Sequence, residues 1–286
     1  TLFRSIDMLY PDDNEIREFF KKNDADIIGL SAVVSTSYLQ VQRISKIIKE
    51  INSRALIVCG GYLTAAANVV LKKTDVDICV VGDGEIAWVG LLNYVKKFST
   101  NNEKLILEEL KKIKGLAVLD NHNNEIIFTG YGHTLSSCHM SFPSFDYLKS
   151  GLQGNDQAVQ NYFRPFDLTL GFRMDERCFE KNRRPMVSSI HVSKGCVAKC
   201  TFCQRGAKGY TTYNLDDLEK HLLQLKKYNV GFLSVDDENF GSNKKYTYEV
   251  AKLFHKHDML WVCTGVRCTS VTKENLQFYK DNGCVS

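Results

Sequence analysis

Three of the ten cysteines lie within eight positions of the chain, in the pattern Cys196-x3-Cys200-x2-Cys203. They follow a β-rich run over residues 186–192 and precede a predicted helix that begins near Asn214. The three thiols are therefore expected on one loop at the C-terminal end of a strand, close enough together to bind a single metal centre.

The number of thiols decides which kind of metal centre is expected. Zinc usually has a fourth protein ligand, most often from a second Cys-x-x-Cys unit, and the nearby His191 is a strand residue that need not point toward the cysteines. An electron-transfer cluster would have four cysteines. Three thiolates leave one iron of a [4Fe–4S] cluster without a protein ligand. A metal site that binds a substrate needs such an open coordination position. We therefore predict an open [4Fe–4S] cluster, with a zinc site or inert structural thiols as alternatives.

The motif Cys196-x3-Cys200-x-Phe202-Cys203, on the loop after the first strand of a βα series, resembles the signature of radical S-adenosylmethionine (SAM) enzymes. The resemblance implies that the three thiolates bind the cluster and that SAM chelates the fourth iron through its amino and carboxylate groups. One electron from the cluster then cleaves SAM to methionine and a 5′-deoxyadenosyl radical, which abstracts hydrogen. It also implies that Phe202 lies near the adenine of SAM.

Two later strand ends carry further candidate SAM contacts. The loop after the second strand contains four polar residues: Asp236, Asp237, Glu238 and Asn239. In the family this position receives the methionyl ammonium, but the chain has no Gly-Gly-Glu here, so the responsible group stays open. Arg267, after the third strand, could pair with the SAM carboxylate. A solvated acidic turn and a surface salt bridge are the alternative interpretations.

A second resemblance lies in the N-terminal part. Ser31-x-Val33, followed after 26 residues by Gly60-Gly61, resembles the Ser-x-Leu…Gly-Gly spacing of cobalamin-binding Rossmann-like domains. The resemblance implies that these residues accommodate the nucleotide tail of cobalamin, since glycine lets the backbone approach a bulky ligand. The next strand end adds Gly82, Gly84 and Glu85. A plain Rossmann turn is the alternative. No Asp-x-His-x-x-Gly motif occurs, so His-on, His-off and cobalamin-free forms stay open.

The elements that must position these residues alternate between strands and helices in two series. The strands of the first series are expected at 26–34, 55–59 and 77–81, and those of the second at 187–192, 231–235 and 260–264. Helical spacing of apolar residues follows each strand, and this alternation predicts parallel sheets covered by helices. Three βα units cannot close a barrel, so the second series is expected to form the first half of one.

We therefore predict an α/β protein. Residues 1–130 are expected to form a Rossmann-like parallel sheet domain of the cobalamin-binding type, and residues 186–286 the first three βα units of a radical SAM partial barrel. Residues 131–185, where the periodicity fades, are expected to form an interdomain connection with some packed segments. The chain lacks an initiator Met and stops where another strand would begin, so truncation is expected at both ends.

Composition excludes several classes of protein. The net charge of +4 is too small to indicate nucleic-acid binding. No apolar run reaches transmembrane length, and the first residues do not resemble a signal peptide, so none is expected. Ten cysteines with three packed together do not resemble a secreted disulfide framework. These features predict a cytoplasmic protein without nucleic-acid or membrane partners.

The function favoured by both resemblances is a cobalamin-dependent radical SAM methyltransferase, with a [4Fe–4S] cluster, SAM and cobalamin as cofactors. The partners expected are a reductant such as flavodoxin or ferredoxin and a substrate that the sequence does not identify. The alternatives are a radical SAM cyclase or rearrangement enzyme, with or without cobalamin, and a non-catalytic iron–sulfur or zinc binding module. No side chain is assigned a catalytic role.

Overall fold

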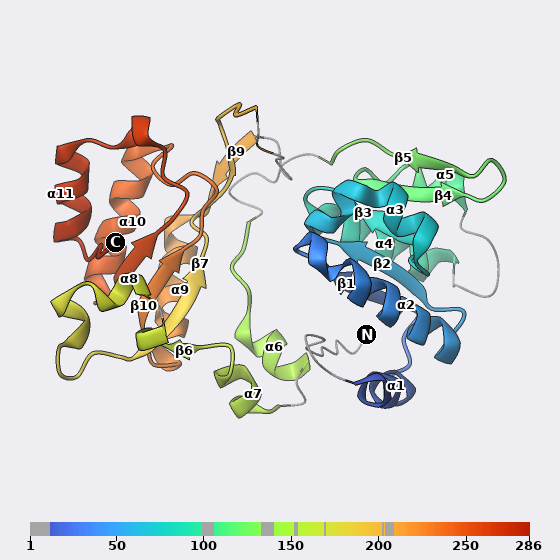
Figure 1. Ribbon diagram of the computed structural model, residues 1–286, viewed down its shortest axis with the longest axis horizontal. Helices are drawn as coiled ribbons and strands as arrows, with labels where there is room; N and C mark the ends of the chain where they lie inside the picture. Colours follow the sequence, from blue (N-terminus) through green and yellow to red (C-terminus); the bar gives the residue numbers. More distant parts are fainter. Residues whose placement is uncertain are drawn as a thin grey trace. The chain divides into compact units, whose positions relative to one another are not determined.

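The computed structural model describes residues 12–98, 106–132, 140–151, 154–168, 170–201, 203 and 209–286. The chain divides near residue 134 into two compact units, each with its own sheet and core (Figure 1). Residues 12–132 are called the N-terminal unit and residues 140–286 the C-terminal unit below. None of the described helices is both long and apolar enough to cross a membrane.

The N-terminal unit contains a five-stranded sheet with the order β1-β2-β3-β4-β5. Its strands are β1 (Ile27–Ser31), β2 (Leu56–Gly60), β3 (Ile78–Val80), β4 (Leu116–Asp120) and β5 (Glu125–Phe128). The first three strands are parallel, and β4 and β5 form an antiparallel hairpin at the edge. The predicted α/β class with a parallel sheet is thus confirmed in this unit.

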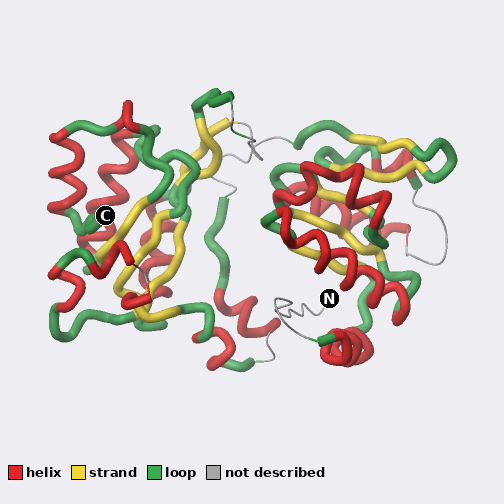
Figure 2. The backbone as a smooth tube through the Cα atoms, in the orientation of Figure 1, coloured by secondary structure: helices red, strands yellow, loops and turns green. Residues whose placement is uncertain are grey.

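Helices cover both faces of this sheet, as Figure 2 shows in red around the yellow strands. They are α1 (Asp13–Lys22), α2 (Tyr38–Ile51), α3 (Ala67–Lys73), α4 (Gly84–Phe98) and α5 (Leu107–Leu110). Alternate residues of β2 point to opposite faces. Ile57 and Cys59 pack with α2 and α3, whereas Leu56 and Val58 pack with α4 and α5. Burial on both faces explains why the parallel strands are continuous apolar runs.

The C-terminal unit contains a four-stranded sheet with the order β11-β10-β7-β6 and a separate two-stranded hairpin, β8-β9. The strands are β6 (Arg164–Pro165), β7 (Met186–Ile190), β8 (Ser193–Cys196), β9 (Gly209–Thr212), β10 (Val230–Val235) and β11 (Leu260–Cys263). Strands β7, β10 and β11 are parallel, so their carboxyl ends meet at one edge of the sheet.

Three helices cover one face of this sheet: α9 (Leu215–Lys227), α10 (Lys244–Lys256) and α11 (Lys273–Asp281). The core on this side includes Trp261, Phe240 and Leu222, none more than 1% exposed. Asn214 begins α9 by accepting a hydrogen bond from the Asp216 backbone N–H, as its sequence position predicts.

Much of the region predicted as an interdomain connection packs onto the C-terminal unit. The other face of the sheet is covered by η4 (Phe166–Leu168), α8 (Leu170–Arg173) and η5 (Glu176–Phe179). Phe166 stacks on Phe232 of β10 with ring centroids 4.5 Å apart, and Phe172 meets the same ring at 5.0 Å. The helices α6 (Phe145–Gly151) and α7 (Asp156–Gln160) lie nearby in the chain, and Val159 joins the core under α9. Aromatic burial holds these segments although they lack a clear period.

Candidate functional site

The cysteine segment is a β-hairpin. Cys196 pairs with Gly209 at the end of the β8-β9 ladder that leads into the connecting loop, and Cys200 and Cys203 follow in that loop. Cys196 is half-buried, whereas Cys200 and Cys203 are exposed, and none of the three is in a disulfide bond. The Cys203 backbone N–H donates a hydrogen bond to the Cys200 carbonyl oxygen at 3.2 Å. Sequence reasoning placed all three cysteines on one loop and so missed β8, which contains Cys196, and β9, although the β-prone residues Tyr210, Thr211 and Thr212 before the α9 cap could have indicated β9.

The three thiols do not converge in this structure. In the part of the chain that is described, no three His, Cys, Asp or Glu side chains are gathered so that they could hold a metal ion. Cys200 and Cys203 lie in the exposed loop, and Cys196 lies at its base. Phe202, which was predicted to lie near SAM, is outside the described residues.

The loop after β10 fastens the base of this hairpin. The Asp237 side chain is buried and accepts hydrogen bonds from the Val192 backbone N–H at 2.8 Å and the Ser193 hydroxyl at 2.5 Å. Burial raises the pKa of the Asp237 carboxyl, and the hydrogen bonds from Ser193 and Val192 oppose that rise. This carboxyl therefore fixes the residue before β8 and the first residue of β8.

Asn239 reaches the cysteine segment directly. Its side chain is 1% exposed, and Nδ2 donates a hydrogen bond to the Cys196 sulfur at 3.3 Å. The Asn239 Oδ1 atom is buried and has no hydrogen-bond partner among the described residues. The structure thus brings together two segments that are 43 residues apart.

The other predicted SAM contacts lie around the same strand ends. Asp236 is half-buried and accepts a hydrogen bond from the Ser234 hydroxyl at 2.8 Å, while Glu238 is exposed. Arg267 is exposed just after β11, and no described carboxylate pairs with it. Gly265 has φ +66°, and a Cβ there would lie 2.3 Å from the Asp237 carbonyl oxygen. The loops after β10 and β11 therefore pack closely against each other.

The N-terminal unit brings together Ser31 and Gly60, which are paired positions at the carboxyl ends of β1 and β2. A Cβ on Gly60 would meet no atom within 4 Å, so the space beside this position is open. Gly61 is different: its φ is +89°, and a Cβ would lie 2.4 Å from the Ala32 carbonyl oxygen. Gly61 is therefore required by the backbone, and Gly60 leaves room beside the strand end.

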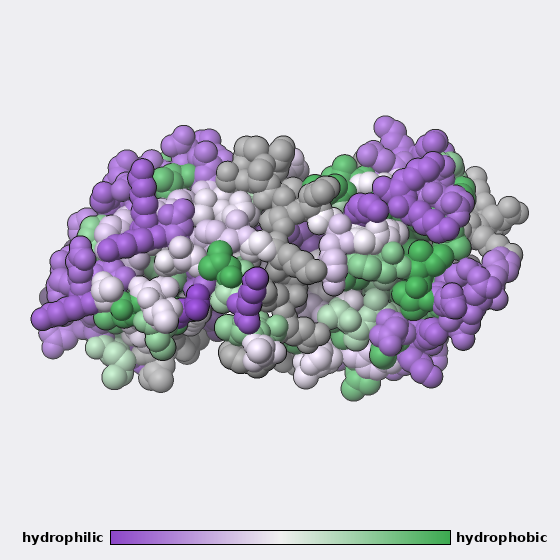
Figure 3. All heavy atoms as spheres, turned by 90° about the horizontal axis from the view of Figure 1, so that it is seen from above, coloured by the Kyte–Doolittle hydropathy of each residue, from purple (hydrophilic) through white to green (hydrophobic). Residues whose placement is uncertain are grey.

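Large apolar side chains are exposed around this strand end: Val33, Val34, Leu39 and Tyr62. The space-filling view shows apolar patches, in green, on the otherwise hydrophilic N-terminal unit at the right (Figure 3). Gly82 follows β3 with φ +87°, and Gly84 and the exposed Glu85 begin α4. Exposed apolar groups at the carboxyl edge of a parallel sheet are typical of a ligand-binding position.

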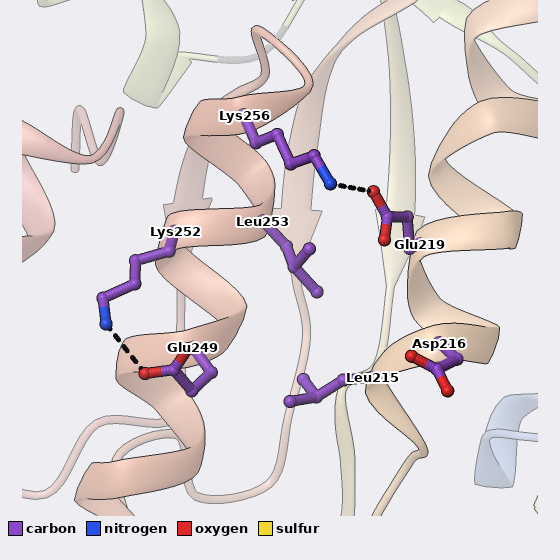
Figure 4. A pocket seen from close by; sticks show the side chains of 7 residues that line it. All are labelled: Leu215, Asp216, Glu219, Glu249, Lys252, Leu253 and Lys256. Atoms are coloured by element: carbon purple, nitrogen blue, oxygen red, sulfur yellow. Dashed lines mark hydrogen bonds and ion pairs between the residues drawn. The ribbon is translucent and has the colours of Figure 1, made fainter.

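A hollow of about 170 Å³ lies elsewhere, between α9 and α10 (Figure 4). Four of its five charged side chains form two ion pairs: Lys256 contacts Glu219 at 2.7 Å, and Lys252 contacts Glu249 at 2.8 Å. None of the predicted site residues lines it. We interpret it as a contact between two helices rather than a ligand site.

Comparison with known proteins identifies one domain and two distant relatives. Residues 5–92 match the family model of the B12 binding domain. The chain is 22% identical over 280 residues to an uncharacterized methyltransferase of Pyrococcus horikoshii and 20% identical over 292 residues to the cytidylyl-2-hydroxyethylphosphonate methyltransferase of Streptomyces wedmorensis.

Each of these alignments covers 95% of this chain, and therefore parts of both units. They cover 52% and 51% of the two relatives, so the chain spans about half the length of the curated relatives it matches. The chain carries a B12 binding domain in residues 5–92 and is distantly related to proteins named as methyltransferases.

Proposed function

We propose that the protein is a cobalamin-dependent radical SAM methyltransferase. The observation that carries the proposal is the combination, in one chain, of a B12 binding domain with a β-hairpin that bears three cysteines outside any disulfide bond. The names of both relatives favour methyl transfer over the other radical reactions considered above. The cytoplasm is the proposed location, because an iron–sulfur cluster needs a reducing compartment.

The donor chemistry of the hairpin fits a [4Fe–4S] cluster. Cys196, Cys200 and Cys203 are free of disulfides, and thiolates are the usual ligands of such clusters. Cys200 and Cys203 are exposed and would have to converge with Cys196 to bind one cluster. The base of the hairpin needs no movement, since Asp237 and Asn239 already hold it.

The carboxyl ends of β1 and β2 fit part of a bulky cofactor. The space beside Gly60 is open, Ser31 is its paired position on the neighbouring strand, and Val33 is 57% exposed just beyond Ser31. Gly82, Gly84 and Glu85 are proposed to border the same ligand at the next strand end. We therefore place the nucleotide tail of cobalamin at this edge in the proposal.

When bound, the cluster supplies the electron that cleaves SAM to methionine and a 5′-deoxyadenosyl radical, and cobalamin serves as the methyl carrier. The residues of this chain are proposed to bind SAM and to orient it. The Asp236 and Glu238 carboxylates are proposed to accept hydrogen bonds from the SAM ammonium, and the Arg267 guanidinium to pair with the SAM carboxylate. Phe202 is proposed to lie against the adenine. The buried Asp237 is occupied by the hairpin, which favours its neighbours for ligand binding.

The test is anaerobic reconstitution of the complete protein with iron, sulfide and cobalamin, followed by addition of SAM and a flavodoxin or ferredoxin reductant. We expect about four irons per chain, the cobalamin absorbance and release of 5′-deoxyadenosine. Cys200→Ala should lose the iron and the 5′-deoxyadenosine but keep cobalamin. Bound zinc in place of iron, or a protein that releases no 5′-deoxyadenosine, would contradict the proposal.

A further inference from the structure

The contact between Asn239 and Cys196 joins the loop that follows β10 to the last residue of β8, where the cysteine loop begins. The Asn239 Nδ2 atom lies 3.3 Å from the Cys196 sulfur, and the Ala198 backbone N–H donates to the same sulfur at 3.3 Å. Sulfur is a weak acceptor when it is a thiol, and a much better one as a thiolate. Two donors directed at one sulfur therefore suit a Cys196 that serves as a metal ligand.

The position of Asn239 is fixed from both sides. On one side, Asp237 is tied to Val192 and Ser193. On the other side, Phe240 is 1% exposed, and its ring packs against Trp261 with centroids 5.5 Å apart. A donor held in this way keeps its direction without the entropy cost of ordering a mobile side chain.

We propose that Asn239 is a positioning residue for Cys196 and that its amide N–H raises the reduction potential of the bound cluster. This inference rests on the proposed function. On reduction, the [4Fe–4S]²⁺ cluster accepts one electron from the reductant and becomes [4Fe–4S]⁺, with no bond formed or broken. The added negative charge is shared with the cysteine sulfurs, so a donor at one of them stabilises the reduced form more than the oxidised form.

Two substitutions remove this donor in different ways. In Asn239→Leu, the leucine side chain is nearly the same size as asparagine but has no hydrogen-bond donor and no charge. This substitution also removes the unpaired Oδ1 atom. Asn239→Asp keeps the shape but turns an acceptor toward the sulfur. The matched control is Asn161→Asp, which makes the same change of charge just after α7, at an exposed side chain that accepts a hydrogen bond from Gln157 at 3.2 Å.

The measurement is an anaerobic redox titration of the reconstituted complete protein with dithionite, followed by EPR of the reduced cluster without SAM. At the wild-type midpoint, Asn239→Leu should lower the ratio of reduced to oxidised cluster about tenfold, which corresponds to about 59 mV for one electron. Asn239→Asp should lower it further, and Asn161→Asp should leave it within about twofold. A merely structural role predicts loss of iron with no change of midpoint in the clusters that remain.

A second measurement covers the case in which the variants do not load a cluster. In wild-type protein labelled with ¹⁵N-asparagine, the reduced cluster should show a ¹⁵N hyperfine coupling in pulsed EPR, and no coupling would overturn the inference. An unchanged midpoint in Asn239→Leu would overturn it while leaving the proposed function intact. If wild-type protein binds no cluster at all, both are wrong.

Discussion

Gly60 and Gly61 are adjacent, yet the structure predicts opposite effects for their substitution. Gly61 has φ +89° and ψ −178°, a region that is nearly restricted to glycine, and a Cβ would lie 2.4 Å from the Ala32 carbonyl oxygen. The backbone conformation costs about 1–3 kcal/mol for another residue, and the overlap costs about 1–3 kcal/mol more. Gly61→Ala should therefore destabilise the N-terminal unit by about 2–6 kcal/mol.

Gly60→Val should leave the fold intact and weaken cobalamin binding. A Cβ at Gly60 meets no atom within 4 Å, and a β-branched residue suits the end of a strand. If the nucleotide tail occupies this space, the added side chain overlaps it at a cost of about 1–3 kcal/mol. That corresponds to an affinity about 5 to 150 times lower.

The assay measures both properties on the same variants: the free energy of unfolding in urea, and cobalamin affinity by absorbance titration. Gly60→Val should change only the affinity, and Gly61→Ala should change the stability. If Gly60→Val binds cobalamin as tightly as the wild type, the cofactor does not lie at the end of β2. If Gly61→Ala is as stable as the wild type, the backbone argument is wrong.

Two further predictions concern buried groups of the C-terminal unit. Burial lowers the pKa of His221 from 6.5 to about 4. Between these pH values His221 is therefore protonated in the unfolded chain and neutral in the folded chain. Stability should fall by about 3 kcal/mol as the pH drops from 6.5 to 4. His221→Leu should remove this dependence in urea unfolding at several pH values, whereas replacing the exposed His255 with Gln should not. Asp237→Ala leaves the Val192 N–H and the Ser193 hydroxyl without an acceptor and should lower the free energy of unfolding by about 2–6 kcal/mol. Ser193→Ala removes only one of these hydrogen bonds and should lower it less. If Asp237→Ala loses no more stability than Ser193→Ala, Asp237 does not hold the start of β8.

The strand and helix alternation could be predicted from the sequence because its signals are local. Runs such as 26–34 are apolar on both faces, and the apolar positions of 38–51 have helical spacing, so β1 and α2 follow from the residues themselves. The packing of Phe166 and Phe172 could not be predicted, because both rings pack against Phe232 of β10, which is far away in the chain.

The same limit applies to the candidate site. The sequence shows two equal glycines at 60 and 61, and only the approach of Ala32 separates a backbone requirement from an open space. Likewise, Asp236 to Asn239 look like one polar loop, but Asp237 and Asn239 point to the hairpin and are buried. Such orientations depend on contacts between distant segments, which residue spacing does not contain.

The release of 5′-deoxyadenosine tests the proposed reaction most directly. The complete protein, reconstituted anaerobically with cluster and cobalamin, should form 5′-deoxyadenosine and methionine from SAM when the reductant is added. Cys200→Ala, with cobalamin still bound, should form neither. Formation of 5′-deoxyadenosine by Cys200→Ala at the wild-type rate, or its absence from wild-type protein that holds four irons, would contradict a SAM-cleaving cluster on this hairpin.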